Sequence, residues 1–454
     1  MDETKELARF VSKVTFDDIP DSAVAKVKEL ILDQLGCQLA GSTLPWTKAS
    51  YEYIRDNKSQ REESTVVSFG LKTIAQDAAF ANANFGHGFM GDDTDSVCHA
   101  HLGSIVIPAA LAMGEREKIS GEQFIKAAVV GYEVASRIGA AAPSAEGRGF
   151  HPGPIFGPFG VAACTGAILG FDENQLLDAL GIAGSHASGL MEYSKSGGTV
   201  NRLHSGIAAY NGIRAILFAQ RGFKGPATIL EGERGFLRAF SGEVSPEEIT
   251  RGLGREFRVL LIDLKAYCCC GTLSAVLDAL SKITGGRDIH PNEIEEIIVN
   301  ASPSTYRLTG TITAPKDITS AQFSGPFGIG LRLTKGSNSF REYSEENLRD
   351  ADILDLMARI RFISDEEIEK TPKSDHPAKV TLRLTDGNVF QETVYAGKGS
   401  ILNPMTTEEV AEKFRGFASE VLTDDDVEAI IETVEQLHLV KDISQLSRLL
   451  VHRS

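Results

Sequence analysis

The chain has 454 residues, of which 42% are apolar and 24% charged, so it has the composition of an ordinary globular protein. Its formal net charge of -16 argues against a nucleic-acid or anionic-membrane partner. Because the acidic N-terminus lacks signal-peptide features, no apolar run reaches the length of a membrane span, and the six cysteines form no CxxC pair, we expect reduced thiols and a cytoplasmic protein.

Helical periodicity dominates the first part of the chain. Two helices are predicted within residues 1–42, because Val24, Val27, Ile31 and Leu35 recur at helical spacing in the second. Further helices are expected near 48–56 and 74–85. Residues 65–69 between them predict a short strand or an extended connection.

Residues 87–115 combine titratable side chains with the start of an apolar helix. The titratable and polar residues of this stretch are His87, Asp92, Asp93, Thr94, Asp95, His99 and His101. The run that follows, 105–113, predicts a buried helix. Polar groups at the entrance to a core helix are costly to desolvate, and histidine exchanges protons near neutral pH. These groups indicate either a catalytic role or a solvated acidic loop that caps the helix.

Helices and two irregular segments follow. Ser120 and Gln123 form a capping-box pattern that begins a helix, and Asp172 and Gln175 mark a further helix whose body is 176–187. Prolines and glycines in 142–158 predict a loop, which carries His151. Residues 191–199 predict a second polar loop before a helix at 201–220. Loops between helices are common places for functional residues.

The pattern changes beyond residue 265. Residues 295–300 predict a strand, and the alternating segments 380–385 and 389–394, joined by Asp386-Gly387, predict a β-hairpin. Amphipathic helices are expected near 408–417 and 427–437. We therefore expect a mainly α chain with a smaller α+β domain. A large helical bundle would comprise 1–265 and 401–454, and an inserted α/β lid domain would comprise 266–400.

Common cofactor motifs are missing from the sequence. It contains no GxxxxGK[ST] phosphate loop, no GxGxxG after a strand, and no GxSxG nucleophile elbow. The GSHASG run at Gly184 is interpreted as packing. His99 and His101 with the nearby aspartates could bind a metal, but the ligand pattern is incomplete. A metal site therefore stays a minor alternative.

Metal-free acid–base catalysis fits the histidines better. Six of the ten, from His87 to His204, fall at loops or helix ends that a helical fold could bring together. A positioned acid or base contributes roughly 10² to 10⁴ in rate. Lys195, Arg202 and Lys265 lie near the same loops and could hold developing negative charge. For His186 and His204, a hydrogen-bonded core position is an equal alternative.

An ordered set of short motifs spans nearly the whole chain. The set comprises His87 with Asp92-Asp93-Thr94, His101 through Pro108 to Glu115, Gly131-Tyr132-Glu133-Val134 with Arg137, Phe150-His151-Pro152, Leu180 to Ser185, Arg202-Leu203-His204-Ser205-Gly206, Gly225-Pro226, Lys265 with Tyr267, Gln322-Phe323-Ser324 and Asn403-Pro404-Met405-Thr406. Together these resemble the MmgE/PrpD family, which contains 2-methylcitrate dehydratase, cis-aconitate decarboxylase and iminodisuccinate epimerase.

The resemblance implies a helical domain that carries most of the site, an α/β lid, a homodimer, and no metal or organic cofactor. The resemblance also implies that the substrate is a small polycarboxylate. By position, the matching site residues are Asp93, Thr94, His101 and His151. Thr94 would bind a carboxylate, and the two histidines would carry protons or bind carboxylates. The expected substrate-binding residues are Arg202, Lys265, Lys195, His204 and Gln322.

Four positions depart from the resemblance. Met90 and Asn201 stand where many members have an aspartate and a lysine, and Ser274 and Phe327 stand where a histidine and a tyrosine are usual. The leading expectation is an enzyme that abstracts a proton α to a carboxylate as a dehydratase-type lyase. The alternatives are a cofactor-independent epimerase of an iminodisuccinate-like dicarboxylate, a non-catalytic carboxylate-binding paralogue and, more remotely, a metal-dependent hydrolase.

Overall fold

The structure is a computed structural model that describes residues 2–287 and 289–452. Its contacts divide the chain into two compact units. The first unit comprises the residues up to 88, 92–262 and those from 407 onward, and the second comprises 89–91 and 263–406. The domain boundaries expected from the sequence, after 265 and 400, stay predictions. The assignment of Phe89–Gly91 to the second unit has no sequence signal.

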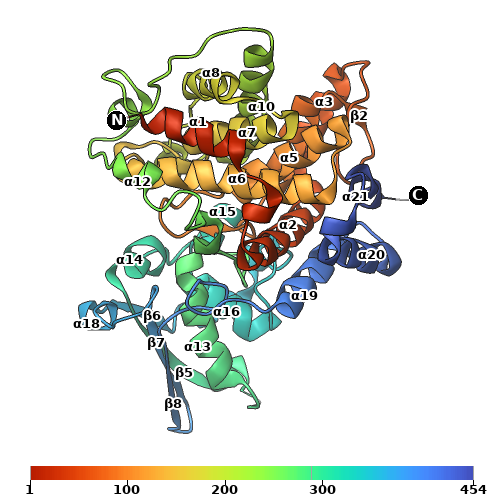
Figure 1. Cartoon of the computed structure of the whole chain (residues 1–454). Helices are drawn as coiled ribbons and strands as arrows, with labels where there is room; N and C mark the ends of the chain where they lie inside the picture. The colour runs from red at the N-terminus through yellow and green to blue at the C-terminus, as the bar shows by residue number, and fades with distance from the viewer. Residues whose placement is uncertain (1, 288, 453–454) are drawn as a thin grey trace. The chain divides into compact units, whose positions relative to one another are not determined.

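The first unit is helical (Figure 1). Its helices are α1 (Glu3–Lys13), α2 (Asp21–Ser42), α3 (Pro45–Asn57), α4 (Ala75–Gly86), α5 (Gly103–Glu117), α6 (Gly121–Ala141), α7 (Pro152–Leu169), α8 (Glu173–Gly184), α9 (Tyr193–Ser196), α10 (Asn201–Gln220), α11 (Phe236–Phe240), α12 (Glu247–Thr250), α19 (Thr407–Ala418), α20 (Asp424–Glu435) and α21 (Ser444–Leu449). Short strands β1 (Ser64–Thr65), β2 (Lys72–Thr73) and β3 (Thr94–Asp95) lie between them, and β4 (Ile262–Asp263) pairs with β3. The predicted mainly α fold is confirmed.

Helix α7 corrects two expectations. The predicted loop at 142–158 is irregular only up to His151, because α7 begins at Pro152. A proline in the first helical turn loses no hydrogen bond, since the N–H groups there have no partner within the helix. The resulting helix is long and apolar enough to cross a membrane, although no such run was expected. It is 83% buried inside the structure, which is typical of a core helix.

Helices α4, α5, α6, α7 and α10 form the core of the first unit. Every residue of α5 from Gly103 to Glu115 is buried. Glycines let these helices approach closely: a Cβ at Gly160 of α7 would lie 2.6 Å from the carbonyl oxygen of Gly131 on α6. The Gly206 amide of α10 donates to Asn84 of α4 at 3.0 Å. These close contacts fix the helix ends that carry the candidate site.

The two ends of the chain meet within the first unit. Helix α19 packs along α2, and the C-terminal helices in blue lie beside α2 in dark red (Figure 1). The buried Asp33 of α2 and Lys413 of α19 form an ion pair of 2.5 Å. This packing explains why helices after residue 406 belong with the N-terminal helices.

The second unit is built on a four-stranded sheet in the order β6-β5-β7-β8. Its strands are β5 (Ile294–Ala301), β6 (Ile360–Ser364), β7 (Ala378–Leu384) and β8 (Val389–Val394). Strand β6 runs parallel to β5, β7 runs antiparallel to it, and the predicted hairpin pairs Leu382 with Phe390. Its helices are α13 (Ser274–Thr284), α14 (Pro303–Thr305), α15 (Ile318–Gln322), α16 (Gly325–Lys335), α17 (Ala351–Met357) and α18 (Glu366–Glu369).

Burial separates the cysteines from the surface. All six cysteines lie among the described residues, are buried, and form no disulfide.

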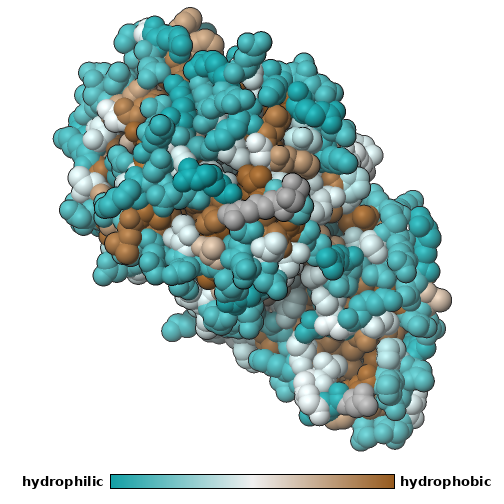
Figure 2. Space-filling model, turned by 90° about the vertical axis from the view of Figure 1, so that its right-hand side faces the viewer, coloured by the Kyte–Doolittle hydropathy of each residue, from teal (hydrophilic) through white to brown (hydrophobic). Residues whose placement is uncertain are grey.

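The face drawn in Figure 2 is largely hydrophilic, with apolar residues in separate patches. Single exposed apolar residues are normal on protein surfaces, so only a connected patch calls for an explanation.

Candidate active site

His101 occupies the connection between β3 and α5 and is held by the backbone. Its Nδ1 lies 2.5 Å from the carbonyl oxygen of Asp93 and 3.4 Å from the Thr94 hydroxyl. A carbonyl oxygen can only accept, so Nδ1 of His101 carries the hydrogen. In the neutral ring, Nε2 then carries the lone pair that a general base requires.

The Asp93 side chain turns away from His101 into the core. Its two oxygens accept hydrogen bonds from the Gly103 amide at 3.0 Å and from the Tyr132 hydroxyl at 2.5 Å. Burial raises the pKa of Asp93 to about 7, although the Tyr132 hydrogen bond opposes this shift. Asp93 therefore positions the start of α5 and the backbone that holds His101.

His87 and Asp92 form a second buried pair beside His101. His87 caps the C-terminal end of α4, and its Nδ1 lies 2.7 Å from Asp92 Oδ2. The other oxygen of Asp92 lies 3.6 Å from His101 Nδ1, and the rings of His87 and His101 are 5.1 Å apart. A carboxylate in this position orients the imidazole beside it.

His151 and His204 form a pair of imidazoles. His151 is the residue before α7 and His204 lies in the first turn of α10, and their Nδ1 atoms are 2.9 Å apart. One ring must therefore donate and the other accept. Burial, followed by the neighbouring histidines, lowers the pKa of His151 well below its usual value. Burial lowers the pKa of His204 to about 4. Both rings are neutral at neutral pH.

The two parts of the cluster are joined through His87. Its ring centroid lies 6.1 Å from that of His151, and Tyr193 of α9 packs edge-on against His151 at 5.6 Å and His204 at 5.9 Å. The histidine cluster is therefore defined as His87, His101, His151 and His204. Four imidazoles in contact offer more than one position for proton transfer.

Three helix N-termini lie at the histidine cluster. Helix α5 begins two residues after His101, α7 begins directly after His151, and α10 begins shortly before His204. The hydroxyls of Ser104 on α5 and Ser205 on α10 lie 3.0 Å apart, which ties two of these ends together. Helix N-termini present N–H groups and a positive partial charge, and they favour bound anions.

Arg202 adds a full positive charge at the same place. It is 6% exposed, and its guanidinium donates to the His87 carbonyl at 3.1 Å. Burial lowers its pKa, and the negative charge of Asp92 opposes that shift. A buried arginine beside helix N-termini is well suited to bind a carboxylate.

The cluster also contains a possible set of metal ligands. Ligand atoms of His87, Asp92 and His101 lie within 4.8 Å of one another. Nδ1 of each histidine has an oxygen partner, an arrangement that leaves Nε2 as the possible ligand atom. The charge of Arg202 acts on Asp92 and opposes a second cation at that carboxylate.

Two predicted substrate-binding residues lie in the second unit. Lys265 is 4% exposed, and its Nζ has no hydrogen-bond partner among the described residues. Gln322 donates to the Cys268 carbonyl at 3.2 Å, so its position is set by the backbone of the cysteine run. A buried ammonium without a hydrogen-bond partner is costly, and an anionic ligand would compensate it.

Other sequence candidates lie elsewhere or outside the description. His99 is 64% exposed at its side chain and contacts Glu146, and His186 contacts the backbone of Asn211. Lys195 falls within α9, but its side chain lies outside the described part of the structure.

The four departures also have places in the structure. Asn201 is buried at the start of α10, Ser274 begins α13, and Phe327 is fully buried against Tyr343. Met90 belongs to the short segment Phe89–Gly91.

Four members of the site are absent from the list of predicted site residues: His87, Asp92, Tyr132 and Tyr193. His87 and Asp92 belong to the same titratable stretch as His101, so their residue types gave a usable signal. Tyr132 lies among apolar residues of α6, and a tyrosine in that setting is more often core than site.

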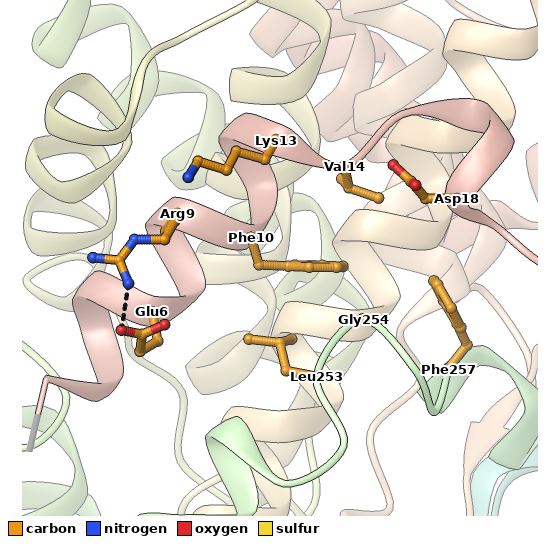
Figure 3. Close-up of a pocket in the computed structure, with 9 residues that line it drawn as sticks. All are labelled: Glu6, Arg9, Phe10, Lys13, Val14, Asp18, Leu253, Gly254 and Phe257. Atoms are coloured by element: carbon orange, nitrogen blue, oxygen red, sulfur yellow. Dashed lines mark hydrogen bonds and ion pairs between the residues drawn. The ribbon is translucent and has the colours of Figure 1, made fainter.

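A separate cavity lies on the surface of the first unit. It has a volume of about 380 Å³ and is lined by Glu6, Arg9, Phe10, Lys13, Val14, Asp18, Leu253, Gly254 and Phe257. Figure 3 shows Phe10 and Leu253 facing one another and Arg9 bonded to Glu6. None of the predicted site residues lines it.

Comparisons with known proteins cover nearly the whole chain. Residues 5–249 match the MmgE/PrpD N-terminal domain, and residues 267–439 match the MmgE/PrpD C-terminal domain. A cis-aconitate decarboxylase of Aspergillus terreus is 30% identical over 98% of this chain and 95% of its own length. The cis-aconitate decarboxylase-like protein oryM of Aspergillus oryzae is 28% identical over 98% of this chain and 97% of its own. A cis-aconitate decarboxylase of Mus musculus is 26% identical over 98% and 93%.

Proposed function

Because the chain belongs to the MmgE/PrpD family, we propose that it is a cofactor-independent lyase that transfers a proton next to a carboxylate of a small di- or tricarboxylate. The observation that carries this proposal is the meeting of three helix N-termini and Arg202 at the histidine cluster. Such a place combines positive potential for a carboxylate with imidazoles that accept and return protons.

In this proposal His101 is the base. Its Nδ1 hydrogen is directed to the Asp93 carbonyl, so Nε2 takes the α-proton of the substrate. Thr94 and Arg202 bind the carboxylate beside the reacting carbon, and His151 donates the proton to the departing hydroxyl as water leaves.

Two other reactions use the same groups. The relatives are named cis-aconitate decarboxylases, which supports testing cis-aconitate as a substrate. Epimerisation is supported by two separately held imidazole systems, His101 on Asp93 and His151 on His204, because inversion at one carbon needs a proton removed from one face and returned to the other. The replacements at Met90, Asn201, Ser274 and Phe327 favour a reaction that needs fewer polar groups than the decarboxylase.

Proton NMR in D₂O with purified protein tests these reactions together. The panel is citrate, 2-methylcitrate, cis-aconitate, malate, tartrate and iminodisuccinate. A new vinylic signal with all carboxylates retained indicates dehydration, and loss of one carboxylate as CO₂ indicates decarboxylation. Loss of an α-proton signal without a new product indicates epimerisation or exchange. No change with any acid, together with ligand-dependent thermal stabilisation, supports the non-catalytic carboxylate-binding alternative.

Variants of the cluster connect turnover to the proposed residues. We expect His101→Ala and His151→Ala each to lower kcat by about 10² to 10⁴. His99→Gln is the matched control, because His99 comes from the same stretch but is exposed and contacts Glu146. If both alanine variants keep full turnover, the assignment of base and acid is wrong. Activity that a chelator abolishes and a divalent metal restores would instead favour a metal-dependent enzyme at His87, Asp92 and His101.

A further inference from the structure

Tyr193 is the side chain of α9 that turns toward the body of the first unit. The neighbouring Glu192, Ser194 and Ser196 are exposed, whereas Tyr193 is half-buried. The chain that follows, 197–200, is exposed as well. A short helix has little stability of its own, so the contacts of Tyr193 and of the adjoining backbone determine where α9 lies.

Backbone contacts hold the segment before α9 against the start of α7. The His151 amide donates to the Gly189 carbonyl at 3.1 Å, and the Met191 amide donates to the Gly149 carbonyl at 2.9 Å. Gly189 lies so close to α7 that a Cβ there would come within 2.5 Å of Pro154, and its φ of 128° suits glycine. These contacts set the position of α9 beside the histidine cluster.

The ring of Tyr193 packs against both imidazoles of the buried histidine pair. Its centroid lies 5.6 Å from that of His151 and 5.9 Å from that of His204, and the two imidazole centroids are 5.1 Å apart. This packing explains the ring but not the hydroxyl, which makes no hydrogen bond to any described residue. A partly buried hydroxyl without a partner is unfavourable, and a ligand that accepts its hydrogen would satisfy it.

Arg202 lies close enough to Tyr193 to act on its charge. Burial raises the pKa of Tyr193 to about 12, and the positive charge of Arg202 opposes that shift. With this pKa, the phenol keeps its hydrogen at neutral pH and can donate it. A guanidinium can only donate. Two neighbouring donors are both satisfied by one acceptor with several lone pairs, and a carboxylate is such an acceptor.

We propose that Tyr193 is a substrate-binding residue, whose hydroxyl donates a hydrogen bond to the carboxylate that Arg202 binds. This inference rests on the proposed function and adds to it a contact from α9. The carboxylate lies beside the histidine pair, where the N-termini of α7 and α10 also favour an anion. A hydrogen bond to a charged acceptor is about twice as strong as a neutral one, so Tyr193 favours the free acid anion over its uncharged ester.

A purely structural role for Tyr193 predicts a different outcome. The ring would then only hold the two imidazoles in place, and loss of its oxygen would change nothing. Tyr193→Phe keeps the ring and removes the oxygen, whereas Tyr193→Ala removes both. The phenylalanine variant therefore separates binding by the hydroxyl from packing by the ring.

Calorimetric titration with propane-1,2,3-tricarboxylate measures binding without turnover, because this acid has no hydroxyl to lose. Tyr193→Phe should weaken this binding, and raise KM for an acid that turns over, by about 10- to 100-fold through loss of one hydrogen bond to a charged group. Its kcat should change little, because the carboxylate is charged before the reaction begins. Tyr210→Phe is the matched control, since Tyr210 is also half-buried and lies 5.6 Å from a guanidinium, that of Arg214, but is outside the cluster.

The alanine variant and the parent chain complete the test. Tyr193→Ala should weaken binding at least as much as Tyr193→Phe and should also lower kcat, because the imidazoles lose their packing partner. Parent-like binding and KM in Tyr193→Phe overturn the proposal, and so does equal weakening by Tyr210→Phe. A parent chain that neither binds nor converts any acid overturns the proposed function together with this contact. A parent chain that converts an acid, with Tyr193→Phe equal to it, overturns this contact alone.

Discussion

His204 acts on the proposed reaction through its neighbour. It holds the ring of His151 through the 2.9 Å contact between their Nδ1 atoms, which leaves Nε2 of His151 for proton transfer. We expect His204→Ala to lower kcat by about 10- to 100-fold with little change in KM, as for other residues that orient a functional side chain. His204→Asn should retain most of the activity, because its amide occupies the position of Nδ1. Equal kcat values for the two variants would contradict this role.

Burial of His151 and His204 also predicts the acid side of the pH profile. In the proposed reaction His151 acts as a neutral imidazole that donates its Nε2 hydrogen, and lowering its pKa keeps that neutral form present at lower pH. With the pKa of His204 lowered to about 4 and that of His151 lowered well below its usual value, neither ring should add a decline of kcat/KM as the pH falls past about 6. A decline centred at about 6.5 that His151→Gln removes would show that this ring is protonated more easily than its burial implies.

Asp93 links the site to stability. Its folded pKa of about 7 lies above the ordinary value of 3.8, so the folded state holds a proton that the unfolded state releases. The favourable contribution is complete below the unfolded pKa and is lost as the pH rises to about 7. Asp93→Asn removes this titration. We expect urea unfolding to show a weaker decline of stability with pH in the variant than in the parent chain over that window. Parallel pH curves would contradict the shift.

At the scale of elements, Arg137 connects α6 to the segment that follows α12. Its side chain is fully buried, bonds Glu133 at 2.6 Å, and donates to the carbonyls of Arg251 at 2.6 Å and Glu256 at 2.9 Å. We expect Arg137→Met to destabilise the fold by about 3–5 kcal/mol, because Glu133 and these carbonyls lose their donor inside the core. Glu133 also accepts a hydrogen bond from the Arg258 amide. A displaced Glu133 would therefore also weaken the position of the backbone before β4.

The measurement for Arg137 is urea unfolding with the exposed Arg55→Met variant as control. Arg55 pairs with its sequence neighbour Asp56 at the surface, where an ion pair contributes little. A similar free-energy change for both variants would show that the buried network of Arg137 does not stabilise the fold. Arg137→Lys should recover only part of the loss, because one ammonium cannot reach the same set of carbonyls.

Short sequence patterns predicted helix starts and turns well where a single local rule decides the structure. The capping patterns at Ser120 and Asp172 begin α6 and α8, and Asp386-Gly387 joins β7 to β8. The start of α7 was missed because proline and glycine indicate a loop in isolation, whereas the buried position and the tolerated proline at the first turn favour a helix. Spacing within the sequence does not contain that tertiary information.

The contacts of the site divide in the same way, into those within one sequence segment and those set by helix packing. The stretch from His87 to His101 placed two histidines and the aspartates in one segment, so their proximity follows from sequence. The contact between His151 and His204 joins positions 53 residues apart and depends on how α7 packs against α10. The partner of Asp93, Tyr132, comes from the middle of a core helix. Residue type and motif therefore predicted which residues to consider, and helix packing determined their partners.

At the scale of the whole molecule, charge predicts how ionic strength affects the reaction. The chain carries a net charge of -16 and the proposed substrate is also an anion, so the long-range field opposes their encounter. Arg202 and Lys265 are buried, and salt screens buried charges less than exposed ones. Added salt should therefore weaken the repulsion more than the local attraction, and kcat/KM should rise as potassium chloride increases toward physiological ionic strength.

Comparing two substrates isolates this electrostatic effect. At a fixed pH, the slope of log kcat/KM against ionic strength should be steeper for a tricarboxylate than for a dicarboxylate that turns over, because the repulsion grows with substrate charge. An effect of salt on the folding of the protein would change kcat/KM to the same extent for both substrates. A kcat/KM that falls with salt for both would mean that the positive charges at the site control the encounter, and that the acidic surface lies too far from the entry path to matter.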